Sequence, residues 1–123
     1  LAKGMKDTLE LFSGEVEQLD SLELAPGQNI HEFRQQFKNK IDVLDLGQGV
    51  VVFCDLAFGT PSNIAGQLLK TEQYKESVQV ITGMNLPMIL EYTQLRDSEF
   101  VSSEVIQIGK EGILNFNEEL KNR

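Results

Sequence analysis

The chain has 123 residues, of which 41% are hydrophobic and 24% charged, so it has the size and composition of one compact domain with an apolar core. Nineteen Asp and Glu residues against eleven Lys and Arg residues give a formal net charge of -8, which repels phosphate backbones and disfavours nucleic acid as a ligand. One Cys and one His cannot supply the ligands of a structural zinc site, and we expect no metal or other cofactor.

Apolar residues at helical spacing, beginning with Leu1 and Met5, predict a first helix over residues 1–13. Gly14 follows this helix and suits the left-handed turn that ends many helices. The pattern starts at the first residue, with no capping residue before it. We therefore expect a further segment to precede Leu1.

The next two predicted elements are a short strand and a long helix. Residues 19–24 carry apolar side chains at 19, 22 and 24 and end in an Ala-Pro-Gly turn, which predicts a strand. Asn29 then caps a helix, with Glu32 three residues later as in a capping box. The apolar residues Ile30, Phe33, Phe37, Ile41 and Leu44 are expected to form the buried stripe of this helix.

Residues 50–54 (Val-Val-Val-Phe-Cys) are apolar on both faces, which is typical of a central strand in a parallel sheet covered by helices on both sides. This run is far shorter than the roughly 20 apolar residues that cross a bilayer, and no basic-then-apolar leader opens the chain, so we expect a soluble protein. Asp55 follows the strand. Thr60 and Pro61 then predict a capped helix start, with the helix over residues 61–72.

The second half of the chain repeats this pattern. Residues 77–82 alternate as a strand and end in a turn at 83–85, after which Leu-Pro begins a helix over residues 86–92. A last helix is expected over residues 102–120, although two glycines weaken its middle.

The order helix, strand, helix, strand, helix, strand, helix, helix predicts the α/β class, with a doubly wound, mainly parallel sheet and helices on both faces. One domain is expected over residues 1–123. Three predicted strands make a thin sheet for this many helices. A strand before Leu1 would complete the first strand–helix unit, so we take the first strand of the sheet to be missing from the given chain.

In doubly wound sheets the functional site lies beyond the carboxyl ends of the strands, and Asp55 occupies that place in the sequence. It precedes Gly59 and a helix start, where backbone N–H groups and the helix dipole favour an anion, phosphate above all. The same residues also have a purely structural explanation. Asp often turns the chain after a strand, and Thr60-Pro61 would begin a helix in any fold.

Three other features have ordinary explanations. His31 lies two residues into a capped helix, where a lone histidine is typical of solvated surface. Cys54 sits in an apolar run with no basic neighbour in sequence, which indicates a buried, inert thiol. Residues 83–88 form a second strand-to-helix turn, which we expect on the same rim as Asp55.

Residues 55–63 (Asp-Leu-Ala-Phe-Gly-Thr-Pro-Ser-Asn) resemble the Asp-to-Gly-[Ser/Thr]-Pro-x-Asn segment of the mannose-type (mannose/fructose/sorbose) enzyme IIA component of the bacterial phosphotransferase system. Residues 83–88 (Gly-Met-Asn-Leu-Pro-Met) resemble the second signature of that family, at the right distance. Residues 1–5 look like the start of its first helix. The resemblance covers essentially the whole chain.

The resemblance implies a small cytoplasmic phosphocarrier of sugar transport. In this family a histidine takes a phosphoryl group from phospho-HPr and passes it to the IIB component, which phosphorylates the incoming sugar. By the same resemblance, Asp55 and Thr60 would be catalytic residues, with Asp55 orienting the histidine. Gly59 and Thr60 would hold the phosphoryl oxygens. The rim of the site would consist of Phe58, Met84 and Asn85.

The resemblance also implies the partners: HPr and the IIB protein directly, the membrane components IIC and IID indirectly, and a second copy of the chain in a homodimer. We expect partner proteins with basic or apolar docking faces, since the net charge of -8 would steer them electrostatically.

The chain departs from the family's pattern in two places. The phosphoacceptor histidine is expected in a turn just before the first helix, upstream of Leu1. His31 does not replace it. If the strand order follows the family, the strand before His31 and the strand before Asp55 lie on either side of the missing strand. Strands two positions apart are separated by roughly 9–10 Å, which is too far for a direct hydrogen bond. Phe58 stands where the family usually has glycine, so the loop either adopts another conformation or offers an aromatic side chain to a partner.

Two alternative functions remain open at this point. A receiver-like signalling domain would carry the phosphoryl group on Asp55 itself, but receivers need a lysine after a later strand, where this chain has Thr82 and Gly83. A regulatory module would keep the fold and the binding of partners without catalysis. An acyl phosphate and a phosphohistidine differ in their stability to pH and hydroxylamine, which separates the first alternative from the phosphocarrier.

Overall fold

A computed structural model describes residues 1–98 and 102–123. The chain divides into two compact units, Leu1–Gly83 and Met84–Arg123. The elements of the first unit are α1 (Ala2–Ser13), α2 (Ile30–Leu44), β1 (Val50–Phe53), α3 (Thr60–Leu68) and β2 (Val78–Ile81), and those of the second are α4 (Leu86–Leu95), α5 (Ser102–Glu111) and α6 (Phe116–Lys121). The predicted α/β class is confirmed.

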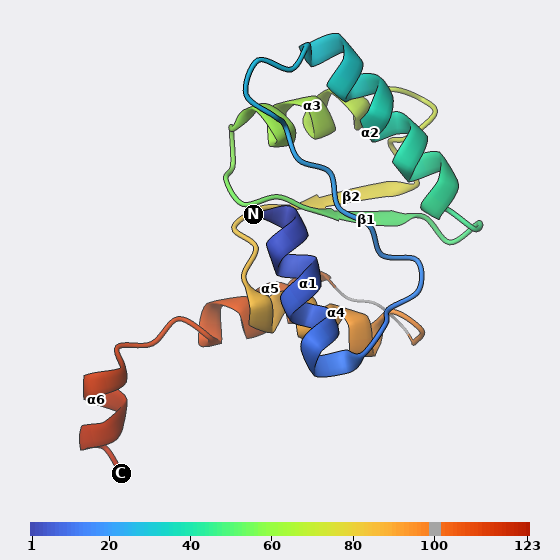
Figure 1. Ribbon diagram of the computed structural model, residues 1–123. Helices are drawn as coiled ribbons and strands as arrows, with labels where there is room; N and C mark the ends of the chain where they lie inside the picture. The colour runs from blue at the N-terminus through green and yellow to red at the C-terminus, as the bar shows by residue number, and fades with distance from the viewer. Residues whose placement is uncertain (99–101) are drawn as a thin grey trace. The chain divides into compact units, whose positions relative to one another are not determined.

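The sheet of the first unit consists of β1 and β2, which pair in parallel from Val50 opposite Val78 to Phe53 opposite Ile81. Figure 1 shows α2 and α3 on one side of this sheet and α1 on the other, so helices cover both faces as predicted. Gly49 leads into β1 with a φ of +85°, and a Cβ atom there would lie 2.6 Å from the carbonyl oxygen of Ser77. Only glycine therefore allows this close pairing at the start of the sheet.

The core of the first unit lies between the sheet and the two helices α2 and α3. The rings of Phe33 and Phe37 pack edge to face, with centroids 6.1 Å apart, which is a favourable geometry for aromatic pairs. The hydroxyl of Tyr74 donates a hydrogen bond of 3.0 Å to Asp42 and ties the turn after α3 to α2. The buried residues of this core are Phe33, Phe37, Ile41, Ile64, Ala65, Leu68, Tyr74 and Val78. The prediction that Ile30 is buried is wrong, because this first residue of α2 lies at the exposed end of the helix.

The strand predicted over residues 19–24 is wrong, because this segment forms neither helix nor strand. Its apolar side chains Leu22 and Leu24 still pack against the core, which explains the pattern that suggested a strand. A strand also needs a paired backbone, and within the described residues β1 has a strand neighbour on one side only, β2. The run predicted as a central strand is therefore one of the two strands that pair within the described part of the chain.

The segment between α1 and α2 is held instead by side chains. The carboxylate of Glu23 accepts a hydrogen bond of 2.9 Å from the amide of Lys3 in the first turn of α1, where negative charge is favourable. Lys40 of α2 donates a hydrogen bond of 2.6 Å to Asp20, and this bond lowers the pKa of the Asp20 carboxyl. Helix α1 ends as predicted, at Gly14 with a φ of 73°.

Asn29 caps α2 as predicted, since its side chain accepts hydrogen bonds from the amides of His31 and Glu32. Helix α3 is shorter than predicted and ends at Leu68. The hydroxyl of Thr71 donates to the carbonyl of Leu68, and turns follow until β2. These turns bury the ring of Tyr74, which a continued helix would place elsewhere.

In the second unit, the helix predicted over residues 102–120 is split into α5 and α6. Asn115 caps α6 through a hydrogen bond of 3.2 Å from the amide of Glu118 to its side chain. The two glycines that were predicted to weaken this helix instead allow α5 to pack closely against α4. A Cβ atom on Gly109 would lie 2.8 Å from Met88, and one on Gly112 would lie 2.8 Å from Pro87.

Among residues 1–98 and 102–123, no helix combines the length and the apolar character that a membrane crossing requires.

Candidate functional site

The candidate site begins where β1 ends. The amide of Cys54 donates a hydrogen bond of 2.9 Å to the carbonyl of Ile81, and the amide of Gly83 donates one of 3.1 Å to the carbonyl of Asp55. The hydrogen bonding of the parallel pair thus continues for two residues beyond Phe53, the last residue of β1. The backbone of Asp55 is therefore fixed at the carboxyl edge of the sheet, as the sequence predicts for a site in this fold.

The side chain of Asp55 is exposed. Its Oδ1 atom accepts a hydrogen bond of 2.8 Å from the amide of the next residue, Leu56. This bond fixes the start of the loop and leaves the second carboxylate oxygen to face solvent or a ligand. An ionised carboxylate in this position can accept a hydrogen bond from an imidazole and set its tautomer.

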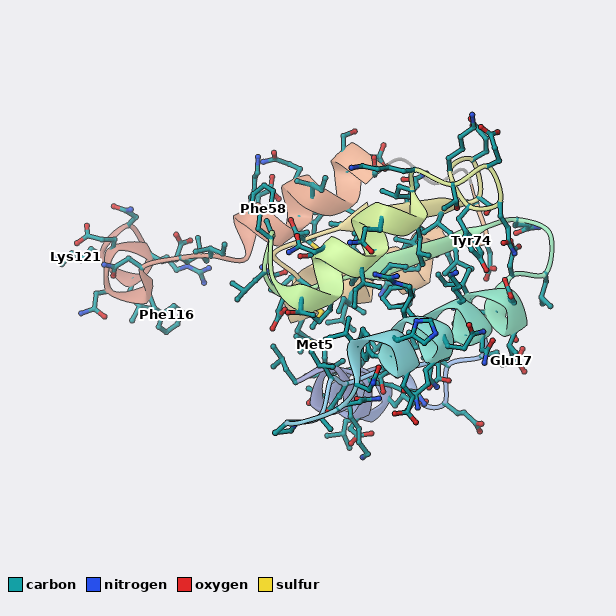
Figure 2. The ribbon with its side chains drawn as sticks, turned by 90° about the horizontal axis from the view of Figure 1, so that it is seen from above. Met5, Glu17, Phe58, Tyr74, Phe116 and Lys121 are labelled. Carbon is teal, nitrogen blue, oxygen red and sulfur yellow. The ribbon has the colours of Figure 1, made fainter. Side chains whose placement is uncertain are left out.

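Phe58 occupies the left-handed region of backbone conformation, with a φ of 65°. A side chain in this region costs about 1 kcal/mol or more, which is why glycine is usual there. The side-chain amide of Asn63 donates a hydrogen bond of 3.3 Å to the carbonyl of Phe58 and supports the turn. The ring of Phe58 is exposed. Figure 2 shows Phe58 at one end of α3 and the buried Tyr74 at the other. The loop therefore keeps a glycine-like conformation despite the aromatic residue.

The prediction that Thr60 caps α3 is wrong. The capping position is Gly59, whose carbonyl accepts hydrogen bonds of 2.9 Å from the amide of Asn63 and from the hydroxyl of Ser62. Thr60 is the first helical residue, and no side chain caps the helix. Because the first amides of a helix carry partial positive charge, an uncapped start is suited to an anion, and the exposed Thr60 hydroxyl lies beside it.

Cys54 is buried, as predicted. Burial, together with the adjacent charge of Asp55, raises the pKa of its thiol from 9.0 to about 11. The thiol is therefore protonated at neutral pH and is a poor nucleophile. His31 is exposed in the first turn of α2, and its amide donates to Asn29. Both side chains match the structural interpretation of the sequence.

Met84 and Asn85, predicted for the rim of the site, begin the second unit. The side chain of Asn85 caps α4 by accepting a hydrogen bond of 3.1 Å from the amide of Met88. The same side chain donates a hydrogen bond of 2.8 Å to the carbonyl of Gly109 in α5. Asn85 therefore has a structural role that the sequence did not reveal, because its second partner is 24 residues away.

The structure thus brings Asp55, Phe58, Gly59 and Thr60 together in one loop of the first unit. The residues it describes, 1–98 and 102–123, contain no group of three or more His, Cys, Asp or Glu side chains that could hold a metal ion. The loop can offer a carboxylate, a hydroxyl and helix amides to a ligand.

A two-stranded parallel pairing with helices on both faces, and an acid at its carboxyl edge beside a helix start, define an α/β protein of the doubly wound type with an anion-binding candidate site. The family model for the PTS system fructose IIA component matches residues 1–108. The chain therefore belongs to this family, which confirms the resemblance drawn from residues 55–63 and 83–88.

Two relatives carry more specific names. The chain is 28% identical over 116 residues to the mannose-specific EIIAB component of Escherichia coli K12, with 91% of this chain and 35% of that protein covered. It is 27% identical over 109 residues to the sorbose-specific EIIA component of Lacticaseibacillus casei, with 89% of this chain and 76% of that protein covered. The chain thus spans 35% of the length of the EIIAB relatives.

Solved structures agree with the fold. The PTS IIA protein associated with the fucose utilization operon of Streptococcus pneumoniae superposes with a TM-score of 0.84 at 34% identity, covering 96% of this chain and 87% of that one. Component EIIA from Streptococcus agalactiae shares the fold, with a TM-score of 0.82 at 24% identity and coverage of 95% and 90%.

Proposed function

We propose that the complete protein is a phosphocarrier of a bacterial sugar phosphotransferase system. It would accept a phosphoryl group from phospho-HPr on a histidine upstream of Leu1 and pass it to a IIB component. The observation that carries the proposal is the match of the IIA family over residues 1–108. The exposed acid at the carboxyl edge of β1, beside the uncapped start of α3, supports it.

The transfer itself needs no cofactor. The unprotonated ring nitrogen of the acceptor histidine attacks the phosphorus atom, and the bond between phosphorus and the ring nitrogen of the donor breaks. The electron pair of the broken bond stays on the donor nitrogen, so one P–N bond replaces another. Transfer to IIB repeats the same exchange.

Each residue of the loop has a role in this proposal. Asp55 accepts a hydrogen bond from one imidazole nitrogen, which leaves the other nitrogen unprotonated for attack. Thr60 and the amides at the start of α3, beginning at Gly59, stabilise the negative charge on the phosphoryl oxygens. Met84 and Asn85 are proposed for the rim.

We infer the position of the histidine from the arrangement of the sheet. We propose that a strand upstream of Leu1 lies beside β1, on the side away from β2, and ends with the histidine next to Asp55. Two observations support this arrangement: within the described residues β1 has one strand neighbour, and residues 19–24 carry a strand-like apolar pattern without pairing. Parallel strands lie about 4.8 Å apart, so neighbouring strand ends place their side chains in hydrogen-bonding reach.

We further propose a cytoplasmic homodimer in which residues 1–123 form, with the upstream strand, one phosphocarrier domain. The membrane components IIC and IID would act only through IIB. The E. coli relatives are named mannose-specific EIIAB components, a name that joins an A part and a B part under one sugar specificity. By analogy, the IIB partner of this chain would be the IIB component of the same sugar system, called the matched IIB below.

The test is phosphoryl transfer by the complete protein, mixed with phosphoenolpyruvate, enzyme I, HPr and the matched IIB. The proposal predicts one phosphoryl group per chain and its passage to IIB. A protein that binds IIB but never takes up phosphate would be the regulatory module, and one that carries phosphate on Asp55 would be the receiver-like domain. Either result contradicts the phosphocarrier.

A further inference from the structure

Phe58 is unfavourable in two independent ways. Its φ of 65° lies in the region that glycine prefers, and 90% of its surface is exposed to solvent. A Gly residue would remove the backbone strain, and a polar residue would remove the exposure of the ring. Strained residues persist mainly where they serve a function, so an outlier of this kind points to a role outside the fold.

The neighbour Leu56 is also exposed, at 67% of its surface. Leu56 and Phe58 are therefore two large apolar side chains on the loop between the candidate acid, Asp55, and the start of α3 at Thr60. Asn63 holds the turn through its bond to the carbonyl of Phe58. A supported turn presents the ring with less freedom than a mobile loop would, which lowers the entropy cost of binding.

We propose that Phe58 is the anchor by which this protein docks its matched IIB component, with Leu56 beside it. This inference rests on the proposed function. A IIB component that takes the phosphoryl group from a histidine beside Asp55 must approach this loop during transfer. Aromatic side chains that fill an apolar pocket at the centre of an interface contribute most of its binding energy.

The chemistry of the partner face follows from the loop and from the whole chain. The IIB face is expected to have an apolar pocket that takes the ring of Phe58. It is expected to have basic residues around that pocket, because the chain carries a net charge of -8. Relatives of this chain are named mannose-specific EIIAB components, a name that joins an A part and a B part under one sugar specificity, so IIB is the partner matched to this chain. Phe58 is therefore assigned to IIB and not to HPr.

The test compares the complete protein with Phe58→Ala, Phe58→Gly and Phe58→Leu variants, and with Phe116→Ala as a matched control. Phe116 is another exposed phenylalanine, in α6 (Figure 2). Transfer to IIB and uptake from phospho-HPr are measured separately as KM and kcat. Direct binding of unphosphorylated IIB is measured by calorimetry, so the docking claim is tested even if no phosphate is carried.

The Ala and Gly variants are expected to raise KM for IIB about tenfold, with kcat unchanged and KM for HPr changed less than about threefold. Phe58→Leu is expected to recover part of the affinity, and Phe116→Ala to leave it unchanged. Phe58→Gly is also expected to raise the melting temperature, because it relieves the strain at φ 65°. A variant more stable yet weaker in docking is the result specific to this proposal.

Unchanged binding of IIB by Phe58→Ala would overturn the proposal, and so would an equal loss of affinity for HPr and IIB. Failure of the wild-type protein to take up phosphate would contradict the proposed function instead. In that case the calorimetric comparison still decides whether Phe58 docks IIB.

Discussion

The amide of Gly83 donates a hydrogen bond of 3.1 Å to the carbonyl oxygen of Asp55. The bond joins the second residue after β1 to the second residue after β2, so the backbone of the acid is held by continued strand pairing. The carboxylate itself remains exposed. A fixed backbone with an accessible carboxylate is what the orientation of a histidine requires.

Replacing the acid tests its role directly. Asp55→Asn is expected to lower the rate of phosphoryl transfer by about 100-fold or more, because a neutral amide neither fixes the imidazole tautomer nor stabilises its positive charge. The free energy of unfolding should change by less than about 0.5 kcal/mol, since the side chain is exposed. Asp97→Asn, at another exposed carboxylate, should leave the transfer rate unchanged.

Gly49 and Gly66 form a matched pair for testing the start of the sheet. Gly49→Ala is expected to lower the free energy of unfolding by about 2–4 kcal/mol, because its φ is +85° and its Cβ would lie 2.6 Å from the carbonyl of Ser77. Gly66 lies inside α3, with nothing within 4 Å of an added Cβ. Gly66→Ala should raise the free energy of unfolding by about 0.5–1 kcal/mol. Urea unfolding measures the free energy of unfolding of both variants, which should fall for Gly49→Ala and rise for Gly66→Ala. A small loss of unfolding free energy for Gly49→Ala would contradict the close pairing.

Asn85 is expected to stabilise the second unit through both of its hydrogen bonds. Asn85→Ala removes the cap of α4 and the bond to Gly109, which should cost about 2 kcal/mol of unfolding free energy. Asn85→Asp keeps the cap and should recover about half of that loss. Asn115→Ala removes only the cap of an exposed helix and should cost less than about 1 kcal/mol. Equal losses for the two Ala variants would show that the bond to Gly109 contributes nothing.

Cys54 makes stability depend on alkaline pH. Burial raises its thiol pKa from 9.0 to about 11, so the folded protein holds this proton more tightly than the unfolded chain does. The corresponding stabilisation is complete below pH 9.0 and is lost as the pH rises through about 11. Between these pH values the free energy of unfolding of the wild type should fall by on the order of 2 kcal/mol more than that of the Cys54→Ala variant. Parallel stability curves for the two proteins would contradict the burial of the thiol.

The elements that sequence reasoning predicted correctly are those with local signals. Helix α2 combines an apolar stripe with the cap Asn29, and β1 lies within the short apolar run of residues 50–54 that Asp55 follows. Helix α6 was missed as a separate element, although Asn115 followed by Glu118 is itself a capping signal. This capping signal was overlooked because the helical spacing of apolar residues continues across the break between α5 and α6.

Features that depend on distant contacts could not be predicted in the same way. Residues 19–24 have the apolar pattern of a strand, but a strand exists only where a second backbone pairs with it. Gly109 weakens an isolated helix, yet in the fold it allows Met88 to approach. The place of Asp55 at the carboxyl edge of the sheet could be predicted from the apolar run before it, whereas the cap at Gly59 depends on how the chain enters α3.

The most direct test of the central claim is the chemical identity of the phosphorylated residue in the complete protein. After labelling through enzyme I and HPr, the phosphoryl group should be labile in acid, stable in alkali and insensitive to neutral hydroxylamine, and mass spectrometry should place it on a histidine that precedes Leu1. A hydroxylamine-sensitive phosphate mapped to Asp55 would contradict the account.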